Sequence, residues 1–479
     1  MRFKTRRFPF PRTLQKVLSL CPDASHIISY DKKEGGFNKV LIFLMNNGKR
    51  IVARLPTRVA GPSILTTNSE VATIAYVKAY TTVPVPHILA WSDDSKNPIG
   101  SEYIIMKHVE GVQLQERWST MSGSQYTKCV QSICMTMKQL AALEFPAYGS
   151  IHFENASFDS TLKIPFGKGF CIGPHCSTTY WGCNTSDTGR GGITAPTGPW
   201  KDLAAYSLGL IANGHSKLPS SDIHISRPSY FSTIKEHQSL LDSAQNILQN
   251  LTTQPQIKHA SAPTLLHADL HARNIFVSDE DPTLITCLID WQSSSIEPAF
   301  IYASEVPDFA TSPDFHDKPS LSEKDLKMEK VASYCNQAYE ICMKAFIPKL
   351  RVARSVNQSL IRPFQYSNTS WRDSATAVRQ EFLDLAENWN DLSLDGECPY
   401  KPSDNELEIH KKEYKAFQHV QELKLMLIRL LGTDSDGWDE VKYAHREVFL
   451  ALKTASENKD DTMTEQDVKE LWPFDDWKF

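Results

Sequence analysis

The stretch LLHADLHARN (residues 265–274) is followed closely by LIDWQ (residues 288–292). On one helix the five-residue step from Asp269 to Asn274 would turn their side chains about 140° apart, so a loop is needed to bring them together. The segments NIFVS and TLITCLID, which surround a turn, predict a short antiparallel hairpin directly after that loop. Asn274 then begins one strand and Asp290 ends the other. The three polar side chains are therefore expected at the same end of the hairpin.

This arrangement suits phosphoryl transfer from ATP, which needs Mg²⁺ held by protein oxygens and a carboxylate that accepts the proton of the nucleophile. The kinase loop H-R-D-x-x-x-x-N, followed by a metal-binding Asp, has the same internal spacing, with Ala268 where the Arg would be. We therefore predict Asp269 as the catalytic base and Asn274 and Asp290 as magnesium ligands. His267 is expected to pack and to hydrogen-bond within the loop rather than to act on substrate. A capped turn before a hairpin is the plain structural alternative.

Residues 25–108 predict a small β-sheet with one helix. KVLIFLM and KRIVARL flank an Asn-Gly pair, which is a strong signal for a hairpin. The helical segment TTNSEVATIAYVKAY follows, with residues 67–69 as its expected cap. The prolines of VPVPH end this helix, and SEYIIMKHVEG predicts a buried strand that ends at a glycine.

The segment KEGGFNKV places a turn between the first two strands, and bare backbone N–H groups in such a turn can approach phosphates. The turn residues are Gly35, Gly36, Phe37 and Asn38. A double glycine also marks ordinary hairpins, so this signal is weak by itself.

Further nucleotide-binding residues are expected along the same sheet. Arg54 ends a strand and Glu70 begins the helix, which matches the cation and carboxylate pair that holds the α- and β-phosphates in kinases. Arginine keeps the positive charge that lysine would supply. Met106 is bulky enough to gate the pocket, and the backbone of Lys107 to Val109 is available to pair with adenine.

Beyond Gly111 the pattern becomes mostly helical. Apolar residues recur at helical spacing over residues 130–141, 240–251 and 331–345, which predicts three core helices. Their periodicity is typical of core faces and does not indicate a cofactor site.

Residues 166–202 interrupt these helices with a stretch rich in Gly, Cys, Trp and Thr. Its weak periodicity predicts a long structured loop or lid. Within it, Cys171, His175, Cys176 and Cys183 have a spacing that is irregular for zinc, so loop packing is the favoured interpretation over a metal site.

The formal net charge of −5 hides an uneven distribution of charge. Residues 1–60 carry 13 Lys and Arg against 3 Asp and Glu, whereas residues 381–479 carry 12 against 24. A basic N-terminal region suits binding of a nucleotide, and acidic helices in the C-terminal region suit binding of a cationic acceptor. Solvated surfaces that balance one another are equally consistent with these charges.

Ten cysteines in a chain of this length, with no secretory h-region among the residues given, predict reduced thiols in a cytosolic or organellar interior. The opening MRFKTRRFPFPRTLQKVLSL has six basic residues and no acidic one, as mitochondrial presequences do. Pro9 and Pro11 interrupt any long helix there, and TLQKVLSL predicts a first helix of the folded domain. We expect a cytoplasmic location, with a mitochondrial one as the alternative. No apolar run approaches the roughly 18 residues of a membrane span.

The motifs EGGFNKV, VARLP, SEVATIAYVKAY, VPVPHILAW, SEYIIMKHVEG, LLHADLHARNIFV and LIDWQ together resemble the aminoglycoside phosphotransferase and choline kinase-like superfamily. More narrowly, they resemble a fungal branch related to altered inheritance of mitochondria protein 9, whose members also show FCIGP and IDWQ. The resemblance covers residues 30–300. It implies that Asp269 is the base, that Asn274 and Asp290 bind magnesium, and that the chain has a kinase-like fold. One departure is Ala-Arg in place of Pro-Gly before the Asn, which affects acceptor geometry more than nucleotide binding.

The expected fold class is α+β, a bilobal protein kinase-like fold with a small antiparallel N-lobe sheet, one helix and a large helical C-lobe. The predicted domains are a basic extension with the first helix at 1–24, the N-lobe at 25–108 and the C-lobe at 109–479. The C-lobe contains the catalytic loop 265–292, the 166–202 insert and the acidic helices.

The leading functional hypothesis is an ATP- and Mg²⁺-dependent kinase that phosphorylates a hydroxyl of a small, possibly cationic molecule, without a nucleic-acid partner. Two other hypotheses stay open. One is a catalytically silent pseudokinase that binds nucleotide as a scaffold. The other is metal-dependent hydrolysis, which needs more metal ligands than residues 265–292 offer.

Overall fold

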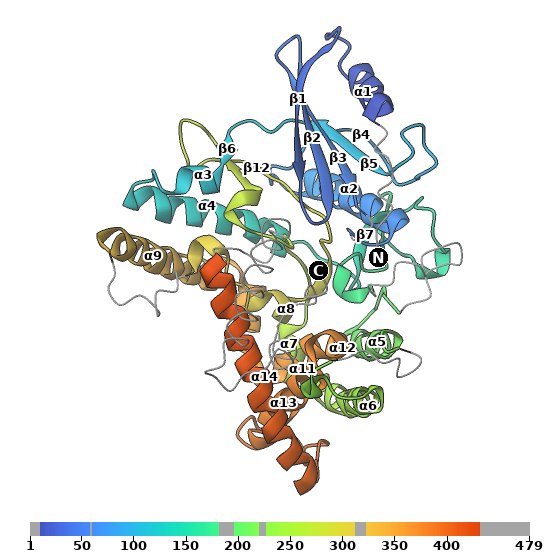
Figure 1. Cartoon of the computed structure of the whole chain (residues 1–479), viewed down its shortest axis with the longest axis vertical. Coiled ribbons are helices and arrows are strands. Elements are labelled where there is room, and N and C mark those ends of the chain that lie inside the picture. Colours follow the sequence, from blue (N-terminus) through green and yellow to red (C-terminus); the bar gives the residue numbers. More distant parts are fainter. Residues whose placement is uncertain (1–9, 58–59, 182–195, 220–226, 312–321, 432–479) are drawn as a thin grey trace, which may run out of the picture. The chain divides into compact units, whose positions relative to one another are not determined.

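The first part of the chain forms a five-stranded antiparallel sheet (Figure 1). The computed structural model describes residues 10–57, 60–181, 196–219, 227–311 and 322–431. The strands lie in the order β1 (Ile27–Glu34), β2 (Asn38–Met45), β3 (Arg50–Pro56), β5 (Tyr103–Lys107) and β4 (Ile88–Ser92). The predicted Asn-Gly hairpin is confirmed as the β2–β3 turn, where Gly48 has a φ of 79° that glycine adopts without strain.

Each face of this sheet is covered because side chains alternate along its strands. On one face, Phe43 and Ile105 are fully buried together with Val17 of α1 (Phe10–Ser19). On the other face, Ile104 and Met106 pack against Val71 of α2 (Ser63–Tyr80). The expected first helix is therefore present as α1. The sheet fixes the face on which α2 and its polar side chains lie.

The helix α2 begins earlier than its sequence suggested. Pro62 is its N-cap residue, and residues 67–69 lie inside the helix and are buried. Proline suits this boundary because its ring fixes φ at a value that is compatible with the start of a helix. The predicted cap was therefore wrong, because the helix already includes these residues, and the side chain of Asn68 bonds to Asp93 and to the backbone N–H of Phe153.

The chain leaves the sheet through Gly111, which has a φ of 90°. A Cβ atom at this position would lie 2.1 Å from the carbonyl oxygen of Val277. Glycine is thus required both by its backbone conformation and by the close approach of another strand. This approach lets β6 (Val112–Gln113) pair with β11 (Ile275–Val277).

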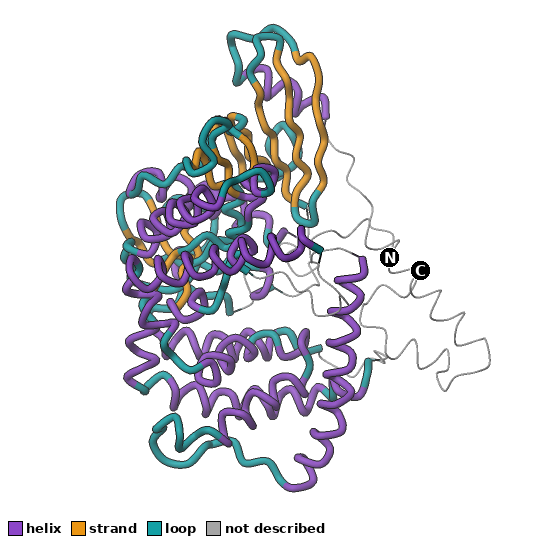
Figure 2. Tube along the Cα trace, turned by 90° about the vertical axis from the view of Figure 1, so that its left-hand side faces the viewer, coloured by secondary structure: helices purple, strands orange, loops and turns teal. Residues whose placement is uncertain are grey.

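Three small sheets follow. The predicted hairpin is confirmed as β11 and β12 (Ile285–Leu288), which form a three-stranded sheet with β6. A second sheet contains β7 (Ser150–Phe153), β9 (Phe170–Gly173) and β8 (Ile164–Phe166), and β10 (Pro263–Leu265) pairs with β13 (Ile296–Pro298). The start of the 166–202 stretch is therefore a short hairpin, and residues 182–195 lie outside the described residues. In Figure 2 the long orange strands belong to the five-stranded sheet.

The described chain divides into two compact units. Unit 1 comprises residues 1–206 and 255–356, and unit 2 comprises residues 207–254 and 357–479. Besides α1 and α2, the helices of unit 1 are α3 (Leu114–Trp118), α4 (Gly123–Ala141), α7 (Pro255–Ala260), α8 (Ala299–Ala303), α9 (Glu323–Phe346) and α10 (Pro348–Arg354). Unit 2 holds most of α5 (Leu203–Ser216) together with α6 (Ile234–Leu251), α11 (Gln358–Ser367), α12 (Ser370–Asp373), α13 (Ala375–Glu387) and α14 (Asp404–Leu431).

The predicted core helices at 130–141 and 240–251 correspond to α4 and α6, and their apolar stripes are buried. The stripe predicted for α9 was displaced. Its buried face includes Cys335, Tyr339 and Met343, whereas Tyr334 and Ile341 are exposed. Both sides of this helix carry apolar residues, so periodicity alone could not select the buried side.

Candidate active site

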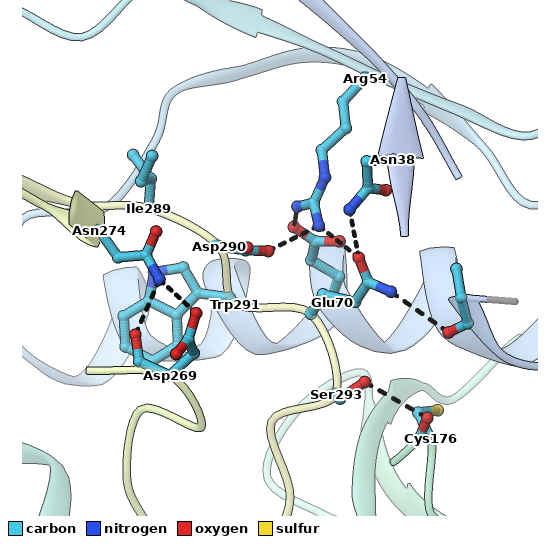
Figure 3. Close-up of polar contacts among 12 residues, drawn as sticks. Asn38, Arg54, Glu70, Cys176, Asp269, Asn274, Ile289, Asp290, Trp291 and Ser293 are labelled. Atoms are coloured by element: carbon cyan, nitrogen blue, oxygen red, sulfur yellow. Dashed lines mark hydrogen bonds and ion pairs between the residues drawn. The ribbon is translucent and has the colours of Figure 1, made fainter. Parts of the chain in front are cut away.

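A loop between β10 and β11 carries Asp269, and Asn274 fixes its conformation. The Asn274 side-chain amide donates to the carboxylate Oδ2 of Asp269 over 2.7 Å and to the Asp269 backbone carbonyl over 2.9 Å (Figure 3). Because Nδ2 is occupied by these two bonds, the amide Oδ1 of Asn274 points away from Asp269. The two predicted residues therefore lie together, and a hard oxygen remains available.

His267 connects this loop to the segment after β12. Its Nε2 donates to the carbonyl of Ile289 over 2.8 Å, and its Nδ1 accepts from the backbone N–H of Asp269 over 3.2 Å. The ring also lies edge-on to Trp291, with centroids 4.8 Å apart. Burial lowers the pKa of His267, so a neutral ring with one donor and one acceptor fits these bonds.

The same segment presents Asp290. The backbone N–H of Ile289 donates to the Asn274 carbonyl over 2.9 Å, which holds the two strand ends together. Asp290 has a φ of 65°, a left-handed conformation that costs energy for a residue other than glycine and that is concentrated at functional sites. Its Oδ1 accepts from Nη2 of Arg54 over 2.6 Å.

Arg54 reaches Asp290 from β3 and also contacts Glu70 of α2 and Gln292 (Figure 3). Its side chain is 8% exposed and that of Glu70 is 5% exposed, so both charges are almost removed from water. Burial raises the pKa of Glu70 to about 7, and the neighbouring Arg54 charge opposes this rise. The predicted Arg54–Glu70 pair is present in the structure, whereas the contact of Arg54 with Gln292 was not foreseen.

The Gly35–Asn38 turn is linked to this group through its last residue. Nδ2 of Asn38 donates to the side-chain oxygen of Gln292 over 2.6 Å. The carbonyl of Phe37 accepts from the N–H of Thr57 over 2.8 Å, and the Phe37 side chain is exposed. A Cβ atom at Gly36 would meet no atom within 4 Å, so its backbone is openly accessible.

The residues predicted to frame adenine lie at the end of β5. Met106 is buried in the cluster that includes Val71, so it packs on α2. The N–H of Lys107 donates to the carbonyl of His87 over 3.0 Å, and the Lys107 side chain is exposed. Val109 follows outside the strand and is partly buried. Their nucleotide contacts stay predictions.

Two cations beside Asp269 were missed by sequence reasoning, although both stand in LLHADLHARN. Nε2 of His271 lies 3.0 Å from Oδ1 of Asp269, and Nη2 of Arg273 lies 3.2 Å from its Oδ2. His271 also faces Asp308, with Nδ1 3.6 Å from Oδ2. Hydrogen bonds to both carboxylates raise the pKa of His271 to about 10. Burial works against ionisation of Asp269, but these cations hold its pKa well below the usual value.

A cavity of about 300 Å³ opens next to Asp269. Its lining includes His271, Tyr302, Glu305 and Tyr339. We call this cavity the Asp269 pocket. No sequence pattern predicted Glu305, because it follows a short helix without any motif. The predicted catalytic loop therefore borders a cavity that is large enough for a small molecule.

The side chains of Asn274 and Asp290 carry oxygens of the kinds that would suit a magnesium ion, and their role as its ligands stays a prediction. Carboxylate and amide oxygens are the ligands that this ion prefers. Among the described residues, no group of three or more His, Cys, Asp and Glu side chains is placed to hold a metal. Asn274 lies outside that set of residue types, and Mg²⁺ usually takes only one or two protein carboxylates.

The cysteine and histidine stretch near residue 175 packs inside the fold. Cys171, His175 and Cys176 are buried, and Nε2 of His152 lies 4.0 Å from Sγ of Cys176. The ring of His175 stacks on Tyr180, with centroids 4.3 Å apart. Cys183 lies outside the described residues. These contacts agree with loop packing.

Comparisons with known proteins find similarity to a phosphotransferase family and to fungal proteins. Residues 227–301 match the APH phosphotransferase enzyme family. A subtelomeric hrmA-associated cluster protein of Aspergillus fumigatus is 28% identical over 88% of this chain and 90% of its own length. Altered inheritance of mitochondria protein 9 of Kluyveromyces lactis, named as mitochondrial, is 22% identical over 80% of this chain and 69% of its own length.

Among solved structures, the ADP-bound aminoglycoside phosphotransferase APH(2'')-Ib is 14% identical. The structural match covers 78% of this chain and 96% of the chain of that enzyme, with a TM-score of 0.38. Within the described part of this chain, none of the helices combines the length and the apolar character of a membrane-crossing segment.

Proposed function

The chain belongs to the aminoglycoside phosphotransferase and choline kinase-like superfamily, in the fungal branch related to altered inheritance of mitochondria protein 9, and from this premise we propose that it is a small-molecule kinase. The proposed reaction transfers the γ-phosphate of ATP to a hydroxyl group of a compact acceptor, with Mg²⁺ as cofactor.

One observation carries this proposal: Asn274 links the catalytic loop to the segment of Asp290. Its side chain donates to Asp269 and its backbone carbonyl accepts from Ile289. A base and two oxygen ligands thus belong to one hydrogen-bonded group. Positioning and electrostatic stabilisation are what phosphoryl transfer requires from a protein.

In the proposed step, the acceptor oxygen forms a bond to the γ-phosphorus and the bond from phosphorus to the β,γ-bridging oxygen breaks, leaving ADP. The acceptor proton passes to the carboxylate of Asp269. Magnesium, held by Asn274 and Asp290, would supply positive charge to the phosphate oxygens. Arg54, fixed by Glu70, offers a further cation on the same side of the sheet as α2.

The turn at residues 35–38 is proposed to cover the phosphates, and the backbone of residues 107–109 to hold the adenine. The cationic acceptor expected from the acidic helices is proposed for the Asp269 pocket instead. Glu381 of α13 pairs with Arg362 at 3.4 Å, and Asp384 accepts from Gln380 at 2.7 Å, so these carboxylates already have partners.

The test has two stages on the full chain. Thermal shift with ATP, with and without Mg²⁺, should show stabilisation that needs both. Incubation with ATP and a metabolite extract, followed by mass spectrometry, should then reveal a product heavier by one phosphoryl group. Absence of nucleotide-dependent stabilisation would reject the proposal.

A silent nucleotide-binding pseudokinase is the second candidate, and one observation favours it. Arg54 already neutralises the Asp290 carboxylate at 2.6 Å, so this carboxylate has a cation without any metal. Stabilisation by ATP that is independent of Mg²⁺, with no phosphorylated product, would support this candidate.

The chain is also proposed to act in mitochondria. Relatives from Kluyveromyces lactis and Saccharomyces cerevisiae are named as mitochondrial, which supports this alternative over a cytoplasmic location. Fractionation of cells that express the full chain would separate the two.

A further inference from the structure

A second cavity, of about 360 Å³, lies in unit 1 and is lined by residues of α2, of β4 and of β7 (Figure 1). We call it the α2–β4 pocket. Branched and aromatic side chains form most of its lining, among them Ile74, Ile88, Trp91 and Phe153. None of its lining residues belongs to the Asp269 pocket or to the predicted nucleotide-binding residues. Its volume falls within the roughly 300–1,000 Å³ of ligand pockets, so it is large enough for a ligand of its own.

The walls of the α2–β4 pocket are joined by Asn68 of α2. Its side-chain amide donates to Oδ2 of Asp93 over 2.9 Å, and its amide oxygen accepts from the backbone N–H of Phe153 over 3.1 Å. Asn68 is buried, and Asp93 directly follows the end of β4. One buried side chain thus ties the helix to both other walls. The pocket is therefore formed before a ligand enters, which lowers the ordering cost of binding.

One side of the lining is aromatic. Trp91 stacks on Phe153, with ring centroids 5.4 Å apart and an interplanar angle of 21°. Phe153 in turn stacks on Phe170, with centroids 5.8 Å apart. Trp91 and Phe153 are only partly buried, so both keep apolar surface that a ligand can cover. Aromatic rings bury a large area at such a wall and gain further from stacked or edge-on contact with other rings.

The charge at the α2–β4 pocket is positive. Among the described residues that line it, Lys78 alone is charged. Lys78 lies in the last turn of α2, is exposed, and makes no hydrogen bond or ion pair within the described part of the chain. The pKa of the nearby His87 is lowered by partial burial and by the charges of Lys107 and Lys78. An anion is therefore favoured beside Lys78. A lysine in the last turn also complements the helix dipole, a role that needs no ligand.

We propose that the α2–β4 pocket is a second ligand site and that it takes an aromatic monocarboxylate, whose ring packs against Trp91 and Phe153 while its carboxylate pairs with Lys78. This site does not depend on the proposed phosphoryl transfer. Because α2 also carries Glu70, the partner of Arg54, a bound ligand adds contacts to the helix that holds this ion pair.

Three probes test the site on the full chain: 2-naphthylacetate, its neutral amide 2-naphthylacetamide, and acetate, which lacks the ring. Ligand-observed NMR titrations give the dissociation constants. The wild-type chain should bind the naphthyl acid about 5-fold more tightly than the amide, the effect of one partly exposed ion pair. Acetate should not bind measurably, because it covers no apolar surface. Lys78→Gln should weaken binding of the acid alone and bring it to the affinity of the amide.

Ala75→Leu adds volume at a half-buried position of the lining and should weaken binding of both naphthyl compounds. Lys235→Gln, at an exposed position of α6, is the matched control and should bind like the wild type. If Lys78 serves the helix dipole alone, Lys78→Gln changes the melting temperature but leaves the preference for the acid intact, which would overturn the inference. Equal affinity of the wild type for acid and amide, unchanged binding in Ala75→Leu, or binding of neither naphthyl compound would overturn it as well.

Discussion

The side-chain amide of Asn274 lies 2.7 Å from the carboxylate Oδ2 of Asp269 and donates a hydrogen bond to it. This bond orients both residues at once: it fixes the carboxylate and turns the remaining amide oxygen of Asn274 outward. The proposed base and the proposed metal ligand are thus arranged by one contact, so their roles can be separated only by substitutions that keep the shape of each side chain.

Asp269→Asn keeps the volume of the side chain but removes the proton acceptor. Turnover on an identified acceptor should fall at least about 100-fold, because general-base catalysis typically contributes about 10²–10⁴-fold. The affinity for ATP, measured by calorimetry, should change little. Asp279→Asn, in an exposed turn, is the matched control and should retain full turnover. Equal rates in the two variants would remove Asp269 from its assigned role.

Asp290→Ala should abolish the part of the ATP-induced thermal shift that depends on Mg²⁺. In the wild type, ligand at about 100 times its dissociation constant stabilises the folded state by about 2.7 kcal/mol. The substitution also leaves Arg54 with fewer partners and lowers the starting melting temperature, so the comparison is made within each variant, with and without the metal. A full magnesium-dependent shift in Asp290→Ala would contradict the ligand assignment.

His271→Asn should change how stability depends on pH. The pKa of His271 is about 10 in the folded chain, against about 6.5 for an unperturbed histidine. The stability that it contributes is therefore complete below about pH 6.5 and is lost as pH rises through about 10. The melting temperature of the wild type should exceed that of His271→Asn at pH 7, and the gap should close towards pH 10. Gln337→Ala, at an exposed position of α9 that carries no ionisable group, should give a gap that does not vary with pH.

Gln292→Ala should lower the free energy of unfolding by about 1–3 kcal/mol, the cost of leaving buried donors without an acceptor. Asn38 and Arg54 both donate to the Gln292 side-chain oxygen, and its amide nitrogen donates to the carbonyl of Ala60 at 3.2 Å. Urea denaturation measures the loss. Gln337→Ala, on the exposed side of α9, should stay within about 0.5 kcal/mol of the wild type.

Gly111→Ala should destabilise the chain far more than Gly48→Ala. Both glycines have positive φ, at 90° and 79°, so each substitution introduces backbone strain of about 1–2 kcal/mol. Only at Gly111 does the added Cβ also meet a backbone oxygen, at 2.1 Å, whereas Gly48 has open space around it. Equal midpoints of urea unfolding in the two variants would show that the backbone near β6 accommodates the added Cβ without a further loss of stability.

Much of the site could be predicted from the sequence because its residues lie in short, ordered motifs. The spacing of Asp269, Asn274 and Asp290 depends on a loop and a hairpin, and both are local structures with recognisable turn residues. The pairing of Arg54 with Glu70 also followed from motif order, since a strand and the helix after it pack together.

The remaining parts depend on contacts between distant segments. Gln292 meets Asn38 across 254 positions of sequence, and Glu305 gains its place only because α8 ends beside the catalytic loop. The cap of α2 was placed too late because Pro62, rather than a polar residue, occupies the N-cap position before Ser63. Tertiary packing decided these points, and no local pattern encodes it.

The five residues from Leu288 to Gln292 contact a different part of unit 1 at almost every position. Leu288 bonds to the carbonyl of Pro84, Ile289 to Asn274, Asp290 to Arg54, and Gln292 to both Asn38 and Ala60. Because these bonds share one short strip of backbone, they cannot open one by one without loosening their neighbours. We expect this strip to exchange its amide hydrogens only when the surrounding segments open together, as a single cooperative unit.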